Sequence, residues 1–400
     1  MRLRKAILPA LVVALAPAFA PGAARAESPA MQIRGTGDLG IVVERAAGRV
    51  VVVETSTPSR LGAIGGLGDL SHASAVFSRD QRHAYVFGRD GGLSKLDLLR
   101  GELVKRVVQA GNSIGGAISQ DGRVVAVSNY DPGGVKLFDA DTLTLLSEIA
   151  AAGDDGKRSK VVGLVDAPDD KLVFALYDAG EIWSADIADP RAPKVLRYRD
   201  IGRLPYDGMI TPDGRHYVAG LFGEDGAAML DLWRPEAGVR RILDRYGRGQ
   251  EPLPVYKMPH LAGWASAGEW GFLPAVGRHE VLIVSLTEWK EAGRIAVHGQ
   301  PVFAVARPDG RQVWVNFAHP DNDVVQVIDV PSRAVVATLR PGRAVLHMEF
   351  TPRGERVWLS VRDADRVDVY DTRRLARVAS IPVDKPSGIF FAARGVRIGY

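Results

Sequence analysis

Short apolar runs separated by polar turns recur along most of the chain. Each copy has an apolar strand, a turn centred on Asp-Gly or an equivalent pair, an Arg or Lys, a second apolar strand, a polar turn and a third apolar strand that ends near Asp. In these turns Pro fixes φ, Asp bonds its own backbone and Gly accepts a positive φ. The first turns of the copies lie at residues 78–82, 119–123, 167–171, 211–215, 307–311 and 351–355.

The third strands are equally regular, as in Val135–Asp139, Val325–Asp329 and Val367–Asp371, and a fourth apolar strand follows each of them. Four strands per repeat at a spacing of roughly 40–50 residues predict a β-propeller. Two less regular copies begin near Gly40 and Trp264, which gives eight blades, or seven if the Trp264 region is an insertion. Residues 388–391 are expected to pair with an N-terminal blade and close the ring, because closure removes free strand edges. We therefore expect an all-β, eight-bladed propeller with four-stranded antiparallel blades, in a single domain over residues 27–400.

The first 26 residues have the pattern of a secretory signal peptide. Arg2, Arg4 and Lys5 precede an apolar run over residues 6–20, and Ala24-Arg25-Ala26 supplies small residues for cleavage. The run is short for a membrane span. Removing the four positive charges of this segment takes the formal charge of +4 to zero. The basic character of the full chain is thus no argument for nucleic-acid binding.

The chain contains no cysteine. Disulfides, a lipid-modified cysteine, cysteine-ligated metals and a Cys-x-x-Cys-His haem attachment are therefore excluded. Together with the N-terminal pattern, this composition predicts a soluble periplasmic protein without a lipid anchor or a membrane span.

Residues 71–98 carry a resemblance to a known family. A histidine precedes a serine-containing strand, which is followed by Arg-His-Ala-Tyr-Val-Phe-Gly-Arg-Asp-Gly and a closing Leu-Asp-Leu. This stretch resembles the d1-haem domain of periplasmic nitrite reductase, and the resemblance extends from about residue 37 to the C-terminus. It includes Asp207-Gly208, Met258-Pro259-His260-Leu261 and residues 354–360.

The departures from the reductase limit what the resemblance implies. The reductase adds a cytochrome c domain, whereas this chain has no cysteine for covalent haem attachment. One of the two distal histidines of the reductase matches His260, and the other falls near Arg307-Pro308. The resemblance implies binding of haem d1 or its late precursor without nitrite reduction. The overall sequence pattern resembles most the single-domain periplasmic members of the family, which are needed for a late step of haem d1 biosynthesis.

Two histidines are candidates for the haem site. In the reductase the residue that matches His72 ligates the iron from the proximal side, and an imidazole at the start of an inner strand suits that role. A capping or packed histidine is the alternative. His260 follows Pro259, which restricts the backbone before it. We expect His260 to be a distal ligand or an acid–base group.

The polar turn at residues 129–134 is the second candidate element. The resemblance implies an essential aspartate in this neighbourhood, and Asp131 is its candidate. A carboxylate beside a polyanionic tetrapyrrole is favoured in its protonated form, which suits a general acid or base. Asn129 and Tyr130 are candidate contacts to the cofactor in the same turn. The alternative is an ordinary Asp-Pro-Gly-Gly turn.

Arginines are the expected partners of the haem carboxylates, because the planar guanidinium pairs a carboxylate bidentately. Arg89, in the Gly-Arg-Asp turn that matches the reductase, is the first candidate. Arg203, with nearby Tyr206, and Arg307 are the next candidates. The alternative is that these arginines are surface residues, because the chain contains 51 Lys and Arg.

Three functions fit these observations. The first is a tetrapyrrole-modifying enzyme that acts on a propionate or lactone by dehydrogenation or hydrolysis, with transient contacts to nitrite reductase and to other proteins of haem d1 biosynthesis. The second is a non-catalytic carrier that delivers haem d1 or its precursor to nitrite reductase. The third is a periplasmic interaction scaffold. The pattern of His72 and His260 argues against this third function.

Overall fold

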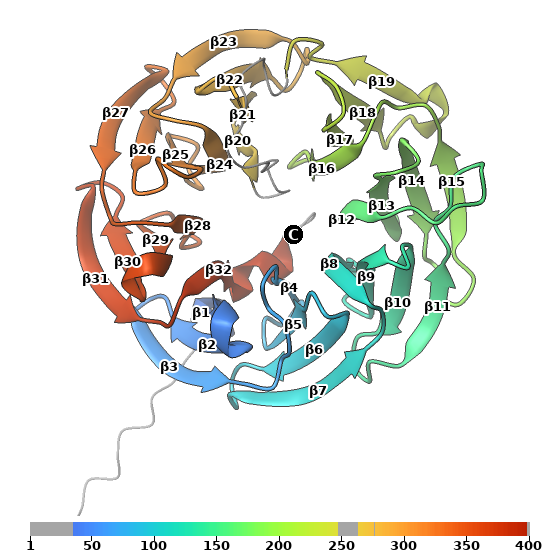
Figure 1. Cartoon of the computed structure of the whole chain (residues 1–400), viewed down its shortest axis with the longest axis horizontal. Helices are drawn as coiled ribbons and strands as arrows, with labels where there is room; N and C mark the ends of the chain where they lie inside the picture. The colour runs from blue at the N-terminus through green and yellow to red at the C-terminus, as the bar shows by residue number, and fades with distance from the viewer. Residues whose placement is uncertain (1–34, 247–262, 276, 398–400) are drawn as a thin grey trace, which may run out of the picture. The chain divides into compact units, whose positions relative to one another are not determined.

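The computed structural model describes residues 35–246, 263–275 and 277–397. These residues form eight four-stranded antiparallel sheets arranged as the blades of a ring (Figure 1), and their helices are short 3-10 turns. The all-β, eight-bladed propeller predicted from the repeats is confirmed, and the Trp264 region is a blade of its own. The predicted signal peptide lies outside the described residues. Within the described ranges we find no helix with the length and hydropathy of a membrane span.

Blades 1 to 4 follow the chain from the N-terminal side. Blade 1 contains β1 (Leu39–Glu44), β2 (Arg49–Glu54) and β3 (Ser59–Ile64), and its inner strand is β32 (Pro386–Phe391). The strands of blades 2 to 4, in order from the inner to the outer strand, are β4 (Ser74–Phe77), β5 (His83–Phe87), β6 (Gly92–Asp97) and β7 (Glu102–Val108); β8 (Asn112–Ile118), β9 (Val124–Asp131), β10 (Val135–Asp139) and β11 (Leu145–Ile149); and β12 (Val161–Ala167), β13 (Lys171–Leu176), β14 (Glu181–Asp186) and β15 (Lys194–Tyr198).

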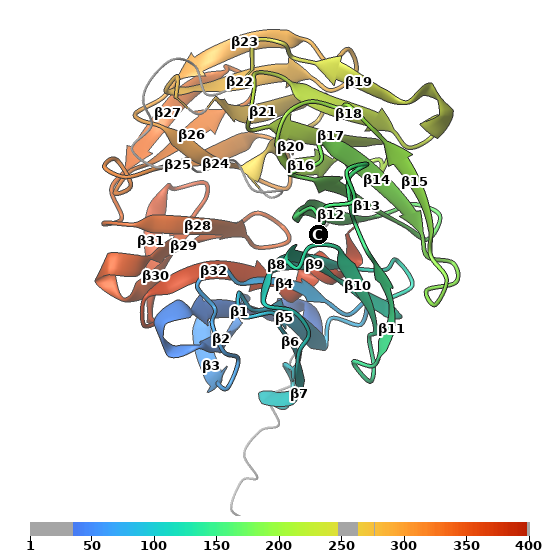
Figure 2. The ribbon, with the colours of Figure 1, turned by 45° about the vertical axis from the view of Figure 1, so that its right-hand side comes forward.

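Blades 5 to 8 complete the ring, which Figure 2 shows from a second direction. Their strands, again from inner to outer, are β16 (Pro205–Ile210), β17 (His216–Leu221), β18 (Ala227–Asp231) and β19 (Val239–Ile242); β20 (Ala265–Ala267), β21 (Trp270–Ala275), β22 (Glu280–Ser285) and β23 (Glu291–Ala296); β24 (Pro301–Ala306), β25 (Gln312–Phe317), β26 (Val325–Asp329) and β27 (Ala334–Leu339); and β28 (Val345–Phe350), β29 (Arg356–Val361), β30 (Arg366–Asp371) and β31 (Ala376–Pro382). The 3-10 turns are η1 (Thr36–Asp38), η2 (Arg45–Ala47), η3 (Pro235–Ala237), η5 (Arg362–Ala364) and η6 (Ala392–Val396).

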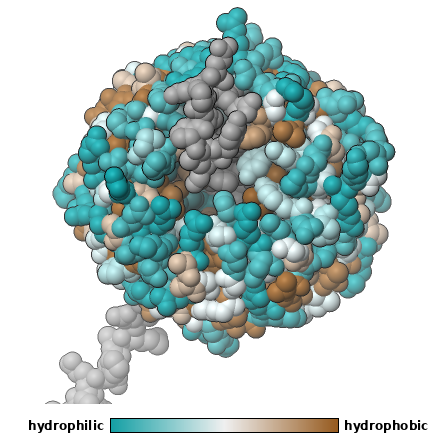
Figure 3. Space-filling model, viewed as in Figure 1, coloured by the Kyte–Doolittle hydropathy of each residue, from teal (hydrophilic) through white to brown (hydrophobic). Residues whose placement is uncertain are grey.

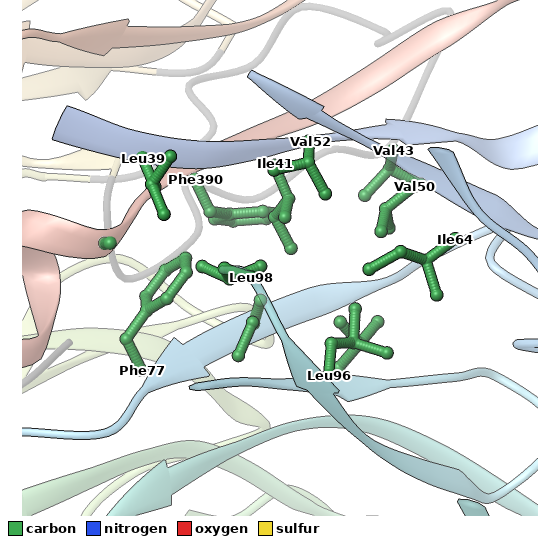
Figure 4. Packing of buried hydrophobic residues seen from close by; sticks show 14 of the residues in the cluster. Leu39, Ile41, Val43, Val50, Val52, Ile64, Phe77, Leu96, Leu98 and Phe390 are labelled. Atoms are coloured by element: carbon green, nitrogen blue, oxygen red, sulfur yellow. The ribbon is translucent and has the colours of Figure 1, made fainter. Parts of the chain in front are cut away.

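Both faces of the second and third strands of each blade are buried, which explains the continuous apolar runs of the sequence. Successive side chains of a strand point to opposite faces of the sheet. Ile41 and Val43 of β1 accordingly pack toward blade 2, against residues such as Phe77 and Leu96 (Figure 4). Val42, between them, packs in a separate cluster with Trp358 of blade 8. On the face of the molecule seen in Figure 3, the coloured residues are mainly hydrophilic with scattered hydrophobic ones.

In four blades the turn after the inner strand is held by its own side chains, beginning with Ser78, Ser119, Thr211 or Thr351. Ser119 illustrates the pattern: its hydroxyl accepts the Val124 N–H at 2.9 Å and donates to Asp121 at 2.6 Å. Asp121 in turn accepts the Arg123 N–H at 2.9 Å, and Gly122 takes a φ of +75°. Thr211 bonds the N–H of His216 in the same way at 2.9 Å. The repeated Ser/Thr, Asp and Gly therefore close the turn and start the next strand.

The ring closes by pairing the two ends of the described chain. β32 forms the inner strand of blade 1 and pairs with β1, with Gly40 opposite Phe391 and Ile41 opposite Phe390. The closing role predicted for residues 388–391 is thus confirmed. A Cβ on Gly40 would lie 2.5 Å from the Phe391 ring, so the glycine makes room for this side chain.

We expect Phe391→Ala to lower the free energy of unfolding by about 3–5 kcal/mol, because truncating a buried aromatic residue leaves a cavity. Phe391 is 1% exposed and packs edge-on against Trp358, with 5.4 Å between ring centroids. Denaturant unfolding would measure the change. Val378→Ala on the outer strand β31, where Val378 is 48% exposed, is the control and should shift stability by less than about 0.5 kcal/mol. Equal effects of the two substitutions would contradict the closing role of Phe391.

Candidate functional site

Most of the predicted site residues lie at one end of the ring. The inner strands all begin at the same end, where each is reached by a connection from the preceding blade. The turns between the second and third strands lie at this end too. We call it the His72 face, since it holds the connection at residues 65–73 that contains His72.

His72 and Arg89 come from two segments of blade 2 that pack on each other. His72 lies in a turn two residues before β4 and is exposed, whereas Arg89 lies in the turn between β5 and β6. Asp69 joins the segments, since its carbonyl accepts the Arg89 N–H at 2.8 Å and its Oδ1 accepts the Ser71 N–H at 2.8 Å. The Ser71 N–H bond and the positive charge of Arg89 hold the pKa of Asp69 below its usual range. Leu67 and Leu70, each 1% exposed, anchor the connection in the core.

The turn predicted at residues 129–134 begins later than expected, because residues 129–131 are the last residues of β9, and the segment has a buried and an exposed part. Asn129 is 0% exposed, and its side-chain amide exchanges two hydrogen bonds with that of Gln109, at 2.8 and 3.2 Å. Asp131, at the end of β9, is exposed, and its carbonyl accepts the Gly111 N–H at 3.1 Å. A Cβ added to Gly111 would lie 2.8 Å from Asp131 Oδ2. Asn129 thus holds the turn, while the Asp131 carboxylate lies over a glycine at the His72 face.

Tyr130 and Tyr206, predicted independently as cofactor contacts, are brought together. The Tyr130 hydroxyl donates to the Tyr206 hydroxyl at 3.2 Å, which joins blade 3 to blade 5 across blade 4. Tyr206 also packs against Tyr177, edge-on at 6.0 Å, and against Phe222 at 6.2 Å. All four rings are partly buried. They form an aromatic cluster, Tyr130–Tyr177–Tyr206–Phe222, at the His72 face.

Tyr177 and Phe222 were not among the residues predicted from the sequence. Each directly follows the second strand of its blade, β13 or β17, at the position where a side chain reaches the His72 face. Aligning the repeats by this position would have found both residues. Lys160 adds a positive charge at the cluster, with Nζ 5.2 Å from the centre of the Tyr177 ring.

Arg203 and Arg307 end up at opposite ends of the ring. Arg203 lies at the His72 face with its side chain 73% exposed, and its N–H donates to Glu224 Oε1 at 2.9 Å. It lines a cavity of about 740 Å³ together with Phe222 and Leu204. Arg307 follows β24 at the far end of its blade, where its Nε donates to the Gly354 carbonyl at 3.0 Å. The structure therefore does not bring Arg307 to the site, because the inner strand that precedes it runs away from the His72 face.

The end of the ring opposite the His72 face is crossed by the C-terminal segment. η6 continues from β32 toward the ring centre (Figure 1). Arg79 donates to the Gly395 and Ser119 carbonyls, at 2.8 Å each, and lies 3.3 Å from Asp166. Arg394 forms a buried ion pair with Glu349. These contacts tie η6 to the turn after β4 and to β28, so a ligand for the residues above would reach them from the His72 face.

His260, the predicted distal ligand or acid–base group, lies outside the described residues. The described residues nevertheless suit an iron tetrapyrrole. His72 offers an imidazole, Arg89 and Arg203 offer guanidinium groups for carboxylates, and partly exposed aromatic rings offer flat apolar surface. Asn112, at the start of β8, has a buried Oδ1 atom without a hydrogen-bond partner, and Asn112 pairs with Asp131 across the ladder. The chemistry of this donor set fits a metal-centred ring with acidic substituents.

The fold and this site define a class of protein: an eight-bladed propeller with a tetrapyrrole-type donor set at one end of its ring. A family model described as the cytochrome D1 heme domain matches residues 34–395. The chain belongs to this family, as the resemblance of residues 71–98 predicted. The predicted ligand class, haem d1 or a late precursor, is confirmed at the level of the family.

Named relatives agree with this assignment. The chain is 61% identical to Protein NirF of Pseudomonas aeruginosa over 370 residues, which cover 92% of this chain and 94% of the relative. It is 56% identical to Protein NirF of Stutzerimonas stutzeri over 369 residues, with the same shares of each chain. A dihydro-heme d1 dehydrogenase of P. aeruginosa is 32% identical over 340 residues, which cover 82% of this chain and 66% of that protein.

Solved structures show the same fold. Dihydro-heme d1 dehydrogenase NirN in complex with DHE superimposes with a TM-score of 0.79 and 28% identity, over 94% of this chain and 79% of that one. AztD from Citrobacter koseri has a TM-score of 0.63 at 12% identity, over 88% of this chain and 96% of that one, and shares the fold alone.

We expect Asn129→Ala to lower the free energy of unfolding by about 1–3 kcal/mol, because it removes both amide–amide hydrogen bonds and leaves the side-chain oxygen of partly buried Gln109 without its donor. Thermal or denaturant unfolding of the ligand-free protein would measure this loss. The double variant with Gln109→Ala should lose less than the sum of the two single variants, as expected for residues that bond each other. Strict additivity would show that the two amides do not interact.

Proposed function

We propose that this protein binds haem d1 or its late precursor at the His72 face and modifies a propionate or lactone side chain of that tetrapyrrole, in a late step of haem d1 biosynthesis that serves nitrite reductase. One observation carries the proposal. The turns of His72 and Arg89, the Asp131 carboxylate and the Tyr130–Tyr206 pair lie at one face of a cytochrome d1 haem propeller. The 61% identity to NirF and the DHE complex of NirN support it.

In this proposal each group of residues at the His72 face has its own role. His72 would hold the iron through one imidazole nitrogen. Arg89 and Arg203 would pair with carboxylates at the edge of the ring, and the aromatic cluster would pack against its apolar surface. When bound, the tetrapyrrole supplies the iron and the side chain that reacts. Asp131 would donate or accept a proton at that side chain, since its carboxylate is exposed at this face.

The compartment and the protein partners belong to the same proposal. The signal-peptide pattern of the first 26 residues supports a periplasmic location. We propose transient contacts with nitrite reductase and with other proteins of haem d1 biosynthesis, which would exchange the tetrapyrrole through the His72 face.

Ligation by His72 predicts a spectroscopic change. Adding haem d1 or its dihydro precursor to the purified protein should shift the Soret band, and His72→Ala should lose the shift and weaken binding at least tenfold. His83→Ala is the matched control from the same blade, because His83 starts β5 at the far end of the ring, and it should bind as the wild type does. A wild-type protein that shows no spectral change would contradict the proposal that the protein binds this tetrapyrrole.

The role of Asp131 separates an enzyme from a carrier. We expect Asp131→Asn to slow conversion of the bound precursor by about 100-fold or more, because a general acid or base typically contributes this much. Tetrapyrrole affinity should stay within about threefold of the wild type. Product formation would be followed by chromatography of the extracted tetrapyrrole.

Asp141→Asn is the control for the Asp131 experiment. Asp141 is an exposed aspartate of the same blade, at the end opposite the His72 face. Its substitution should therefore leave conversion unchanged. Conversion unaffected by Asp131→Asn would remove Asp131 from the mechanism. Binding without conversion in the wild type would favour the carrier function.

A further inference from the structure

We infer that Asp69 is a positioning residue that sets the place of His72 relative to Arg89. The inference rests on the proposed function, because it concerns two residues to which that function assigns the iron and a carboxylate. Asp69 was not predicted from the sequence. It lies three residues before His72, is exposed, and neither belongs to a strand nor touches the aromatic cluster in any contact described above.

The backbone around His72 needs a local support. β4 begins at Ser74, so residues 71–73 lie outside the hydrogen-bonded ladder. The Ser71 N–H donates to the Asp69 carboxylate at 2.8 Å, and the Ala73 N–H donates to the Leu70 carbonyl at the longer distance of 3.3 Å. The side-chain bond of Asp69 is thus the shorter of the two bonds that shape the His72 turn. It is an Asx-turn, in which an aspartate replaces a backbone acceptor.

The same residue fixes the Arg89 turn through its backbone. The Asp69 carbonyl accepts the Arg89 N–H at 2.8 Å, and the Asp69 N–H donates to Asp90 Oδ2 at 3.3 Å. Asp90 in turn accepts the Gly92 N–H at 3.0 Å and pairs with Arg106 at 2.5 Å. Asp69 therefore bonds forward to the His72 turn and across to the Arg89 turn.

Two glycines let the two segments approach this closely. A Cβ on Gly88 would lie 3.2 Å from the Asp69 carbonyl oxygen, and a Cβ on Gly68 would lie 2.1 Å from Asp90 Oδ2. Gly68 also has a φ of +77°, which a residue with a side chain rarely adopts. The two segments are therefore in contact through their backbones and through the Asp90 carboxylate, which accepts the Asp69 N–H.

The functional consequence follows from the rigidity of a tetrapyrrole. The macrocycle holds its metal and the ring carbons that carry its acidic side chains at fixed distances, so the turns that present the imidazole and the guanidinium must be held in place before binding. The ionised Asp69 carboxylate also attracts the positively charged side chain of Arg89. Loss of the Asx-turn would let the His72 turn move, whereas the Arg89 turn would stay in place because the Asp69 carbonyl still accepts its N–H.

Three variants test this inference. Asp69→Ala removes the acceptor for the Ser71 N–H, and Asp69→Asn keeps an acceptor oxygen without the charge. Asp189→Ala removes an equivalent Asx-turn elsewhere, where Asp189 Oδ1 accepts the Arg191 N–H at 3.0 Å in the loop between β14 and β15. Amide hydrogen exchange at Ser71 would be measured in the ligand-free protein. Haem d1 titrations would give the affinity and the Soret position of the complex.

We expect Asp69→Ala to speed exchange at Ser71 by about tenfold or more, to weaken haem d1 binding about tenfold and to move the Soret band away from its wild-type position. Asp69→Asn should restore the exchange rate, the band position and an affinity within about threefold of the wild type. Asp189→Ala should match the wild type in all three measurements.

Two outcomes would overturn the inference. One is an Asp69→Ala protein with the Ser71 exchange, band position and affinity of the wild type. The other is an Asp69→Asn protein as impaired as Asp69→Ala, which would mean that the acceptor oxygen is not what matters. A wild type that binds no haem d1 would instead refute the proposed function, and the exchange data would still report on the Asx-turn itself.

Discussion

The pairing of β32 with β1 is the interaction on which the rest of the structure depends. Each blade buries both of its faces against its neighbours, so a ring with a gap would leave two apolar sheet faces in water. A strand from the C-terminal side completes the N-terminal blade and removes that gap. The cost of fixing both chain ends is offset by the burial of Phe390, Phe391 and Ile389 between blades 1, 2 and 8.

Closure also decides where chemistry can take place. In a closed ring the connections between blades gather around one end of the channel, and residues from distant parts of the chain meet there. Tyr130 and Tyr206 bond each other across an intervening blade for this reason. At the other end, Arg79 and the Glu349–Arg394 ion pair hold η6 across the inner strands. The two ends of the ring are therefore different in kind, and the polar and aromatic groups of the site lie at the end where His72 is.

Sequence patterns predicted the blades well because each blade is a local unit. The Ser/Thr-x-Asp-Gly turns hold themselves through bonds within five residues, as Ser119 does with Val124, so their chemistry is visible in the chain. The same patterns could not tell a site residue from a supporting one. Asn129 and Asp131 stand two positions apart at the end of β9, yet Asn129 is fully buried against Gln109 and Asp131 is exposed. Arg307 has the residue type expected at the site but lies at the wrong end of its strand.

By itself, the sequence determined the strand and turn repeat, the propeller class and the cytochrome d1 haem family, because these rest on local turn chemistry and on recurring motifs. Only the tertiary structure decided which residues share the His72 face. It placed Tyr177, Phe222 and Asp69 at this face and Arg307 at the opposite end of the ring. The physical reason is that the closed ring fixes the end at which each loop lies. Contacts between blades that are far apart in the chain leave no local sequence pattern.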